Sequence, residues 1–118
     1  MNYNLNYKNG DFKIFFEDGQ LKEKGIVKNG ELDGIWESYY ENGTLKIKTT
    51  YNKGKNNGYY YSYYDNGQIK FETIYINNIR QNYYKWYDMN GNLIEENCTK
   101  TKVLLKKSTS KTIVRNIV

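Results

Sequence analysis

Apolar and polar residues alternate along most of the chain, and Gly and Asn interrupt the alternation at regular intervals. The run GIWESYY (34–40) is followed by ENGT and LKIKTTY, and the run GYYYSYY (58–64) is followed by DNGQ and IKFETIY. A side-chain period of two with many aromatic and β-branched residues predicts strands, and the frequent Gly argues against helices. The pattern therefore predicts an all-β chain of successive hairpins.

The pattern repeats every 24 residues without gaps, as the spacing of Gly10, Gly34 and Gly58 shows. Three further columns share this period: Gly19, Gly43, Gly67 and Gly91; Phe12, Trp36, Tyr60 and Tyr84; Leu21, Leu45, Ile69 and Leu93. One hairpin cannot bury its apolar face alone, so we expect neighbouring hairpins to join in a single-layer antiparallel meander. The predicted repeat domain is 1–97, with copies at about 10–33, 34–57, 58–81 and 82–97, and a short C-terminal tail, 98–118, follows.

Each predicted hairpin has an Asn-Gly or Asp-Gly pair at its tip. Such pairs favour the two-residue type I′ turn, which needs φ > 0 at both central positions. We expect this turn, with a structural glycine, at Asp18-Gly19, Asn42-Gly43, Asn66-Gly67 and Asn90-Gly91. Residues 52–57 are expected to form a longer turn into the next hairpin.

These turns predict a register and two faces. Tyr40 is expected opposite Leu45, Ser38 opposite Ile47 and Trp36 opposite Thr49. Face A is predicted to carry the main apolar layer: Trp36, Tyr40, Leu45, Ile47, Tyr51, Tyr60, Tyr64, Ile69, Phe71, Tyr75, Tyr84, Trp86 and Leu93. Face B is predicted to be wet and to carry the expected pairs Glu37–Lys48, Tyr39–Lys46, Tyr61–Glu72 and Tyr63–Lys70, with Phe15 and Tyr87.

Face B offers the candidate binding residues. The predicted partner-binding side chains are Tyr39, Tyr59, Tyr61, Tyr63 and Tyr87. A one-layer sheet has no second layer to bury them, and Tyr gives a large contact area at low entropic cost. The alternative is that they are exposed without a partner, because AT-rich coding favours Tyr, Asn, Lys and Ile.

Composition narrows the chemistry. The 118 residues include no His and a single Cys, Cys98. This excludes His-dependent acid–base catalysis, Ser–His and Cys–His nucleophiles, and intramolecular disulfides, and it disfavours a metal or other cofactor. The chain has no apolar stretch long enough to span a bilayer, and MNYNLNYKNG lacks the features of a signal peptide. We therefore expect a cytoplasmic protein that is not an enzyme.

Charge is concentrated at the C-terminal end. Residues 1–97 carry 12 Lys and Arg against 13 Asp and Glu, whereas 98–118 carry six Lys and Arg and no acid. A nearly neutral body argues against nucleic-acid binding, and the tail could contact an anionic membrane weakly. For the tail itself, strands, a short amphipathic helix packed on the sheet and a solvated terminus all remain open.

The repeat resembles the MORN-repeat variant of bacterial proteins, including the YwqK-type antitoxins. In the second copy the matching residues are Gly34, Trp36, Tyr39, Tyr40, Asn42, Gly43, Leu45, Tyr51, Gly54 and Gly58. The departures are Tyr60 and Tyr84 in the Trp column, and Asn78 and Asn82 where Gly is expected. The resemblance implies a curved single-layer sheet with no catalytic residues, and it suggests an antitoxin or immunity-like protein that binds another protein. The alternative is a repeat protein that associates with lipid through its tail.

Overall fold

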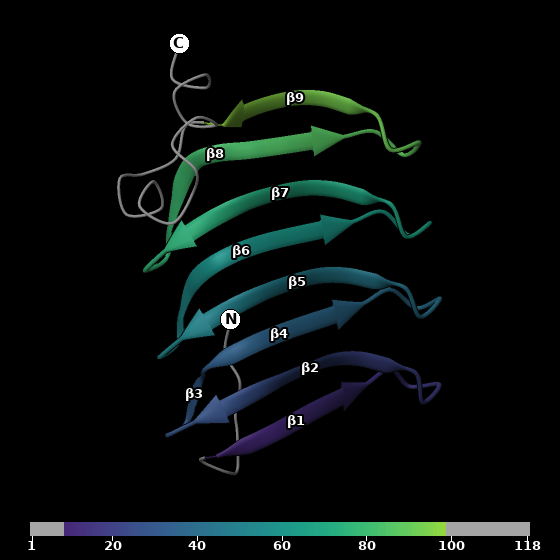
Figure 1. The fold of residues 1–118 in the computed structure, drawn as a ribbon. Coiled ribbons are helices and arrows are strands. Elements are labelled where there is room, and N and C mark those ends of the chain that lie inside the picture. Colours follow the sequence, from purple (N-terminus) through teal and green to yellow (C-terminus); the bar gives the residue numbers. More distant parts are fainter. Residues whose placement is uncertain (1–8, 99–118) are drawn as a thin grey trace.

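The computed structural model describes residues 9–98, which form one open antiparallel sheet whose strands follow one another in chain order (Figure 1). The strands are β1 (Gly10–Phe15), β2 (Leu21–Lys28), β3 (Glu31–Leu32), β4 (Gly34–Tyr39), β5 (Leu45–Asn52), β6 (Lys55–Tyr63), β7 (Ile69–Ile76), β8 (Ile79–Tyr87) and β9 (Leu93–Cys98). The short β3 pairs only with β2, and β2 also pairs with β4. The predicted all-β meander of hairpins is confirmed. The expectations for the tail concern residues outside this range, apart from Cys98.

The predicted register holds up to the last pair before each turn. Trp36 lies opposite Thr49, Glu37 opposite Lys48 and Ser38 opposite Ile47. The next pair, however, is Tyr39 with Leu45, so the expected pairs Tyr40–Leu45 and Tyr39–Lys46 are wrong. The same shift pairs Tyr63 with Ile69 in place of Lys70.

A β-bulge causes this shift, because two residues of β5 lie opposite one residue of β4. Lys46 and Ile47 both lie opposite Ser38 and on its side of the sheet, and Lys46 lines a hollow of face A with Ile47 and Trp36. Leu45 consequently shares a side with Tyr39, on face B. Equivalent bulges place Ile69 and Leu93 there as well. The assignment of Leu45, Ile69 and Leu93 to face A was therefore wrong.

The predicted type I′ turns at the Asn-Gly and Asp-Gly tips are also wrong. At Asn42-Gly43 the Gly43 N–H donates to Tyr40 O (2.9 Å) and the Tyr40 N–H donates to Thr44 O (2.9 Å). Gly43 has a φ of 91°, whereas Asn42 is not among the residues with positive φ. This is a three-residue loop, in which a type I turn is followed by a left-handed glycine. The Asn42 Oδ1 atom accepts the Thr44 N–H (2.9 Å), so the Asn acts through its side chain.

Type I′ turns occur at the opposite ends of the strands. Asn29-Gly30, Lys53-Gly54 and Asn77-Asn78 each have two consecutive positive φ values, between 49° and 83°. The flanking pairs are Lys28–Glu31, Asn52–Lys55 and Ile76–Ile79. The expected longer turn over 52–57 is thus a two-residue turn, and β6 begins at Lys55.

Side-chain hydrogen bonds join each hairpin to the next one, and each bond links two residues that are 23 positions apart in the sequence. The Asn42 Nδ2–H donates to Asp65 O (2.9 Å), and the Asn66 Nδ2–H donates to Met89 O (2.9 Å). The Tyr40 and Tyr64 hydroxyls donate to Tyr63 O (2.6 Å) and Tyr87 O (2.7 Å). These bonds stack the turns, as Figure 1 shows along one side of the sheet.

This ladder can be tested with a reciprocal pair of variants. Asn42→Asp keeps the acceptor for the Thr44 N–H but removes the donor to Asp65 O, and should lower the free energy of unfolding by about 0.5–1 kcal/mol. At the equivalent position of the first hairpin, Asp18 accepts the Gln20 N–H and cannot donate to the next turn. Asp18→Asn should therefore stabilise by a similar amount. Urea denaturation at high salt, which screens the charge change, measures both, and changes of the same sign would contradict the ladder.

The core lies on face A at the β1–β4 end. Phe12, Val27 and Trp36 are buried there and contact Ile47 and Tyr51 among other side chains. Further along, Thr49 and Thr73 are buried, and their hydroxyls donate to Asn56 Oδ1 (2.9 Å) and Tyr83 O. Buried threonines thus replace the apolar core on face A in the part of the sheet where the column of Phe12 and Trp36 continues with Tyr60 and Tyr84.

Face B is not uniformly wet, contrary to the prediction. Ile74 lies opposite Tyr59 on this face and is 1% exposed. Tyr83 is 5% exposed, and its hydroxyl donates to Glu72 Oε2. The wet part of face B is therefore confined to other positions, described next.

Candidate interaction surfaces

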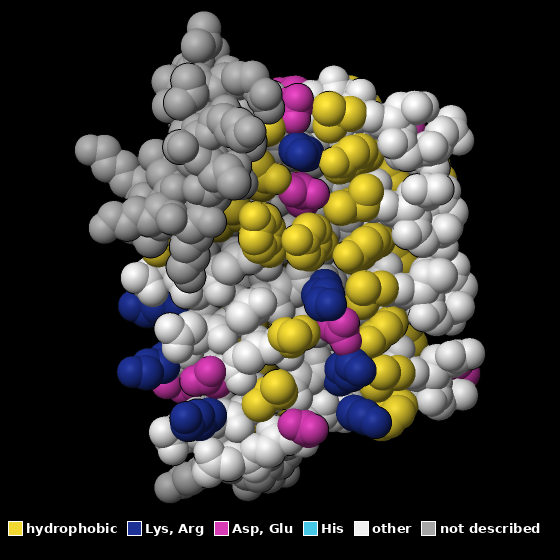
Figure 2. All heavy atoms as spheres, viewed as in Figure 1, with side chains coloured by type: hydrophobic (Ala, Val, Ile, Leu, Met, Phe, Trp, Pro, Cys, Tyr) yellow, Lys and Arg dark blue, Asp and Glu magenta, His cyan; other side chains and the backbone are white. Residues whose placement is uncertain are grey.

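Face B carries an unbroken row of apolar side chains beside the Asn-Gly turns, which we call the aromatic row. Its members, paired across each hairpin, are Phe15, Leu21, Tyr39, Leu45, Tyr63, Ile69, Tyr87 and Leu93. Phe15 and Leu93 at its ends are 55% and 47% exposed, and the six between them are half-buried. Figure 2 shows the row as a yellow column along the right of this face. The bulges create it, since without them the aliphatic members would lie on face A.

A second row on face B, which we call the charged row, carries Lys and Glu of both signs around one Tyr. Its members, each directly opposite the next, are Lys13, Lys24, Glu37, Lys48, Tyr61, Glu72, Lys85 and Glu96. The Glu37 carboxylate lies 3.5 Å from Lys24 Nζ and accepts the Tyr39 hydroxyl at 3.0 Å. This charged row runs beside the aromatic row in Figure 2, so the face is an apolar strip with a polar border.

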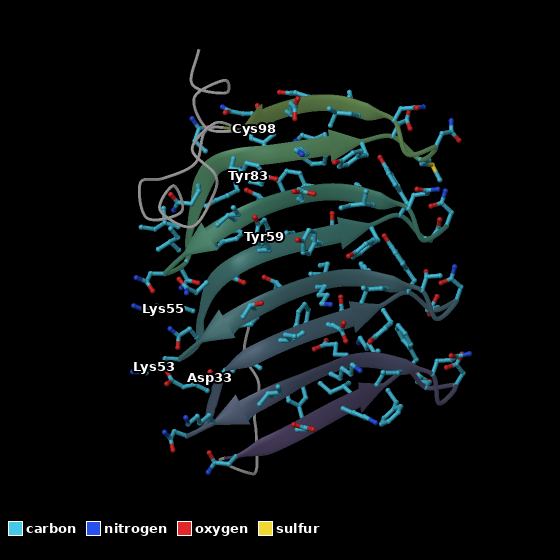
Figure 3. All side chains as sticks on the ribbon, viewed as in Figure 1. Asp33, Lys53, Lys55, Tyr59, Tyr83 and Cys98 are labelled. Atoms are coloured by element: carbon cyan, nitrogen blue, oxygen red, sulfur yellow. The ribbon has the colours of Figure 1, made fainter. Side chains whose placement is uncertain are left out.

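The structure places all five predicted partner-binding tyrosines on face B. Tyr39, Tyr63 and Tyr87 belong to the aromatic row, and Tyr61 belongs to the charged row. Tyr59 stacks on Tyr61 with ring centroids 5.7 Å apart and contacts Tyr83 edge-on at 6.5 Å. Tyr59 on β6 and Tyr83 on β8 lie on either side of β7 (Figure 3). The five side chains therefore share one face of the sheet, but Tyr59 lies outside the aromatic row and packs against Tyr61 and Tyr83.

Three face B tyrosines, Tyr39, Tyr61 and Tyr63, have a raised pKa. Burial, the hydrogen bond to Glu37 and its charge raise the pKa of Tyr39 from 10 to about 12. Burial first, and then nearby carboxylates, raise the pKa of Tyr61 and of Tyr63. A phenol that stays neutral can donate a hydrogen bond to a partner over the whole physiological range.

This pKa predicts a loss of stability in alkali. The folded state holds the Tyr39 proton up to pH 12, whereas the unfolded chain releases it near pH 10. The stabilisation is therefore present in full below pH 10 and is lost as the pH rises through 12. In Glu37→Gln the acceptor loses its charge, so the pKa of Tyr39 should fall toward 10. An NMR titration of the Tyr39 ring carbon measures both values, and an unchanged pKa in the variant would contradict the role of Glu37.

Face A carries a second feature that the sequence analysis missed. Lys22, Lys46 and Lys70 each lie over an aromatic ring, those of Phe16, Tyr40 and Tyr64, at 5.8, 5.5 and 5.6 Å from the ring centroids. Lys46 and Lys70 had been assigned to face B, and the bulges bring them to face A. Their 24-residue spacing in the sequence indicates that the three lysines occupy equivalent positions, but the bulge determines that these side chains lie on face A.

In residues 9–98, no group of three or more Cys, Asp or Glu is arranged to hold a metal ion. None of the secondary structure there is a helix of the length and apolar character that crosses a membrane.

The fold defines a protein built of repeated β-hairpins in one open sheet. The family model described as "MORN repeat variant" matches residues 5–29, 32–53 and 56–77, and the chain belongs to this family. Members of this family are repeat modules for interaction with proteins or membrane lipids. No curated protein and no solved structure matches the chain.

Proposed function

We propose that this protein is a non-enzymatic module that binds another protein through face B. The observation that supports this most directly is the aromatic row, which crosses all four hairpins without interruption and is nowhere fully buried. Interfaces have an apolar centre rich in Tyr and a polar rim. The aromatic row with the charged row beside it has this composition.

The charged row supports specificity. Its fixed order of Lys and Glu gives a partner a defined charge pattern to match, and a partner in a displaced register would place like charges together. The Glu37 carboxylate already pairs with Lys24 Nζ at 3.5 Å within this row. The proposed partner therefore has an apolar ridge flanked by charges complementary to this row.

The family resemblance extends the proposal to an antitoxin or immunity-like role in a bacterial cytoplasm. In that role the chain would neutralise a toxin by covering its active surface, which needs area and fit but no catalytic group. Glu37 and Glu72, the carboxylates nearest the proposed site, accept hydrogen bonds from Tyr39 and Tyr83. Carboxylates that already accept hydrogen bonds from nearby strand residues are poor candidates for acid–base catalysis.

The test uses two tyrosines on opposite faces. Tyr63 and Tyr84 are both half-buried, and Tyr63 lies on face B whereas Tyr84 lies on face A. Tagged wild-type chain should capture one protein stoichiometrically from a lysate of the source cells. Tyr84→Ser should retain that protein, and Tyr63→Ser should lose it while keeping the strand signal in circular dichroism.

Two outcomes would contradict the proposal: no capture by the folded wild type, and equal capture by both variants. The antitoxin role has its own test, in which the captured protein arrests growth when expressed alone and is neutralised by co-expression of this chain. A third arm uses vesicles of phosphatidylglycerol, because the lipid-binding alternative depends on the basic tail. Vesicle binding that is lost on removal of 99–118, without any captured protein, would replace the proposal.

A further inference from the structure

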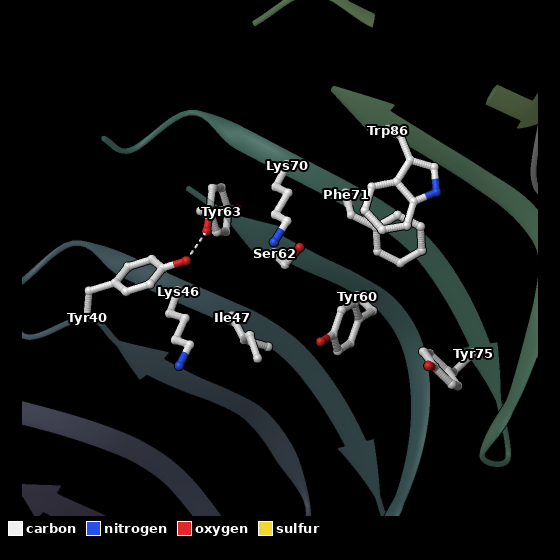
Figure 4. Close-up of a pocket in the computed structure, with 10 residues that line it drawn as sticks. All are labelled: Tyr40, Lys46, Ile47, Tyr60, Ser62, Tyr63, Lys70, Phe71, Tyr75 and Trp86. Atoms are coloured by element: carbon white, nitrogen blue, oxygen red, sulfur yellow. Dashed lines mark hydrogen bonds between the residues drawn. The ribbon is translucent and has the colours of Figure 1, made fainter. Parts of the chain in front are cut away.

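A groove crosses face A at right angles to the strands. Its floor is a row of directly opposed residues from β4 to β8: Ser38, Ile47, Ser62, Phe71 and Trp86. Two adjoining hollows of about 250 and 340 Å³ lie along it and share Lys46 and Ile47. Figure 4 shows the larger hollow, with Lys46 beside Ile47 and Lys70 beside Ser62. The small serines leave room between the larger side chains, so the floor is notched rather than flat.

Cations line the groove at a regular interval. Lys22 on β2, Lys46 on β5 and Lys70 on β7 line the two hollows, and each is held over an aromatic ring. Successive members are two strands apart in the sheet order, which corresponds to about 9.6 Å at the usual strand spacing. Glu23 is the one carboxylate in the lining of these hollows. The groove therefore favours an anion that repeats along its length.

Two buried donors beside this groove have no acceptor. Trp36 Nε1 and Ser38 Oγ are buried, and neither has a hydrogen-bond partner among the described residues. Their side chains are 6% and 9% exposed and line the smaller hollow with Lys46. A buried donor without an acceptor is unfavourable, because it has lost its hydrogen bond to water without replacement. A ligand oxygen in this hollow could accept a hydrogen bond from either group.

We propose that the face A groove binds an acidic peptide segment in an extended, polyproline-like conformation, with a carboxylate at every third residue. Such a chain rises about 3.1 Å per residue and has three residues per turn, so residues i, i+3 and i+6 point the same way. Their spacing of about 9.3 Å matches the interval between the lysines. The residues between the acids would contact Ile47 and Phe71.

The occupant follows from charge. The chain's own residues 98–118 contain six Lys and Arg and no acid, so they would be repelled by the three lysines. A second copy of face A would present the same lysines. A separate acidic peptide is the occupant that complements the groove, and the contact is distinct from the proposed partner surface on face B.

The experiment measures fluorescence anisotropy of two labelled peptides with the full-length chain. Both peptides contain three Glu and the same Pro and Leu residues, but one has Glu at i, i+3 and i+6 and the other has three consecutive Glu. The spaced peptide should bind at least fivefold more tightly than the clustered one. Its affinity should fall as salt rises from low to physiological concentration.

Matched variants on one strand locate the contact. Lys46 and Lys48 both lie on β5, but Lys46 lines the groove whereas Lys48 lies opposite Glu37 on face B. Lys46→Gln should weaken binding of the spaced peptide at least fivefold, and Lys48→Gln should leave it within twofold. Equal losses in both variants, equal affinity for both peptides, or no binding at low salt would overturn the proposal. Binding of phosphatidylglycerol vesicles in place of either peptide would also overturn it. Tyr39 and Tyr63 also contribute to the lining of the hollows, but all of these measurements leave both residues unchanged, so the two proposals fail separately.

Discussion

Trp36→Ala is expected to lower the free energy of unfolding by about 3–5 kcal/mol, the usual range for truncation of a buried Trp. Trp36 is 6% exposed and forms the buried cluster with Phe12 and Val27. Its ring also contacts Tyr51 edge-on, with centroids 6.4 Å apart. The sheet has one layer, so its neighbours cannot close the cavity from an opposite layer. Urea denaturation followed by circular dichroism measures the loss.

Trp86 provides the matched control. It lies on the same face two hairpins further along, is 39% exposed and stacks on Phe71 at 4.2 Å. Trp86→Ala should cost about 1–2 kcal/mol, because much of its surface is already in water. Tyr63→Ala on face B should cost about 1 kcal/mol. A larger loss from Trp86→Ala or Tyr63→Ala than from Trp36→Ala would show that the core is misassigned.

Gly25→Val should destabilise the fold by about 3 kcal/mol, at the upper end for overpacking of a core. A Cβ atom at Gly25 would meet the Phe12 ring at 2.7 Å and Trp36 Cδ1 at 3.0 Å. Both neighbours are rigid aromatic rings, so neither can move aside without a change of rotamer. Gly25 lies within β2, where β propensity alone would favour Val over Gly. Packing therefore predicts that Gly25→Val lowers the free energy of unfolding, whereas β propensity predicts that it raises it.

A second substitution distinguishes the two explanations. Phe12→Leu removes the ring that a new side chain at Gly25 would meet. In the double variant Gly25→Val/Phe12→Leu, the cost should be smaller than the sum of the two single costs by at least about 1 kcal/mol. Strict additivity, or stabilisation by Gly25→Val alone, would show that the close approach of Phe12 to Gly25 does not limit this position.

Much of the fold could be predicted from the sequence because its information is local. A hairpin pattern repeated every 24 residues sets the strands and their order, and pairs such as Trp36–Thr49 follow from counting away from the tip. The five tyrosines that we propose to bind a partner could be assigned to one face by the same alternation. The predicted pairing is wrong only for the residues nearest each Asn-Gly or Asp-Gly turn, where a bulge inserts one extra residue into the second strand.

The turns show why the sequence was insufficient there. A left-handed glycine is required both in the second position of a type I′ turn and at the end of a three-residue loop, so Asn-Gly is compatible with either. Asn42-Gly43 takes the second form and Asn29-Gly30 the first. The Asn42 Nδ2–H donates to Asp65 O of the neighbouring hairpin, a hydrogen bond that exists only when the two hairpins lie side by side.

A meander of hairpins with a repeating aromatic surface thus follows from the amino-acid pattern alone, because strand alternation and repeat period are properties of nearby residues. Which side chains form each surface depends instead on how the strands pair in the folded sheet. The bulges move Leu45 to face B and Lys46 to face A, and so create both the aromatic row and the lysine-lined groove. The physical reason is that side-chain direction depends on an unbroken ladder of hydrogen bonds, and the position at which that ladder shifts is set by the contacts between neighbouring strands.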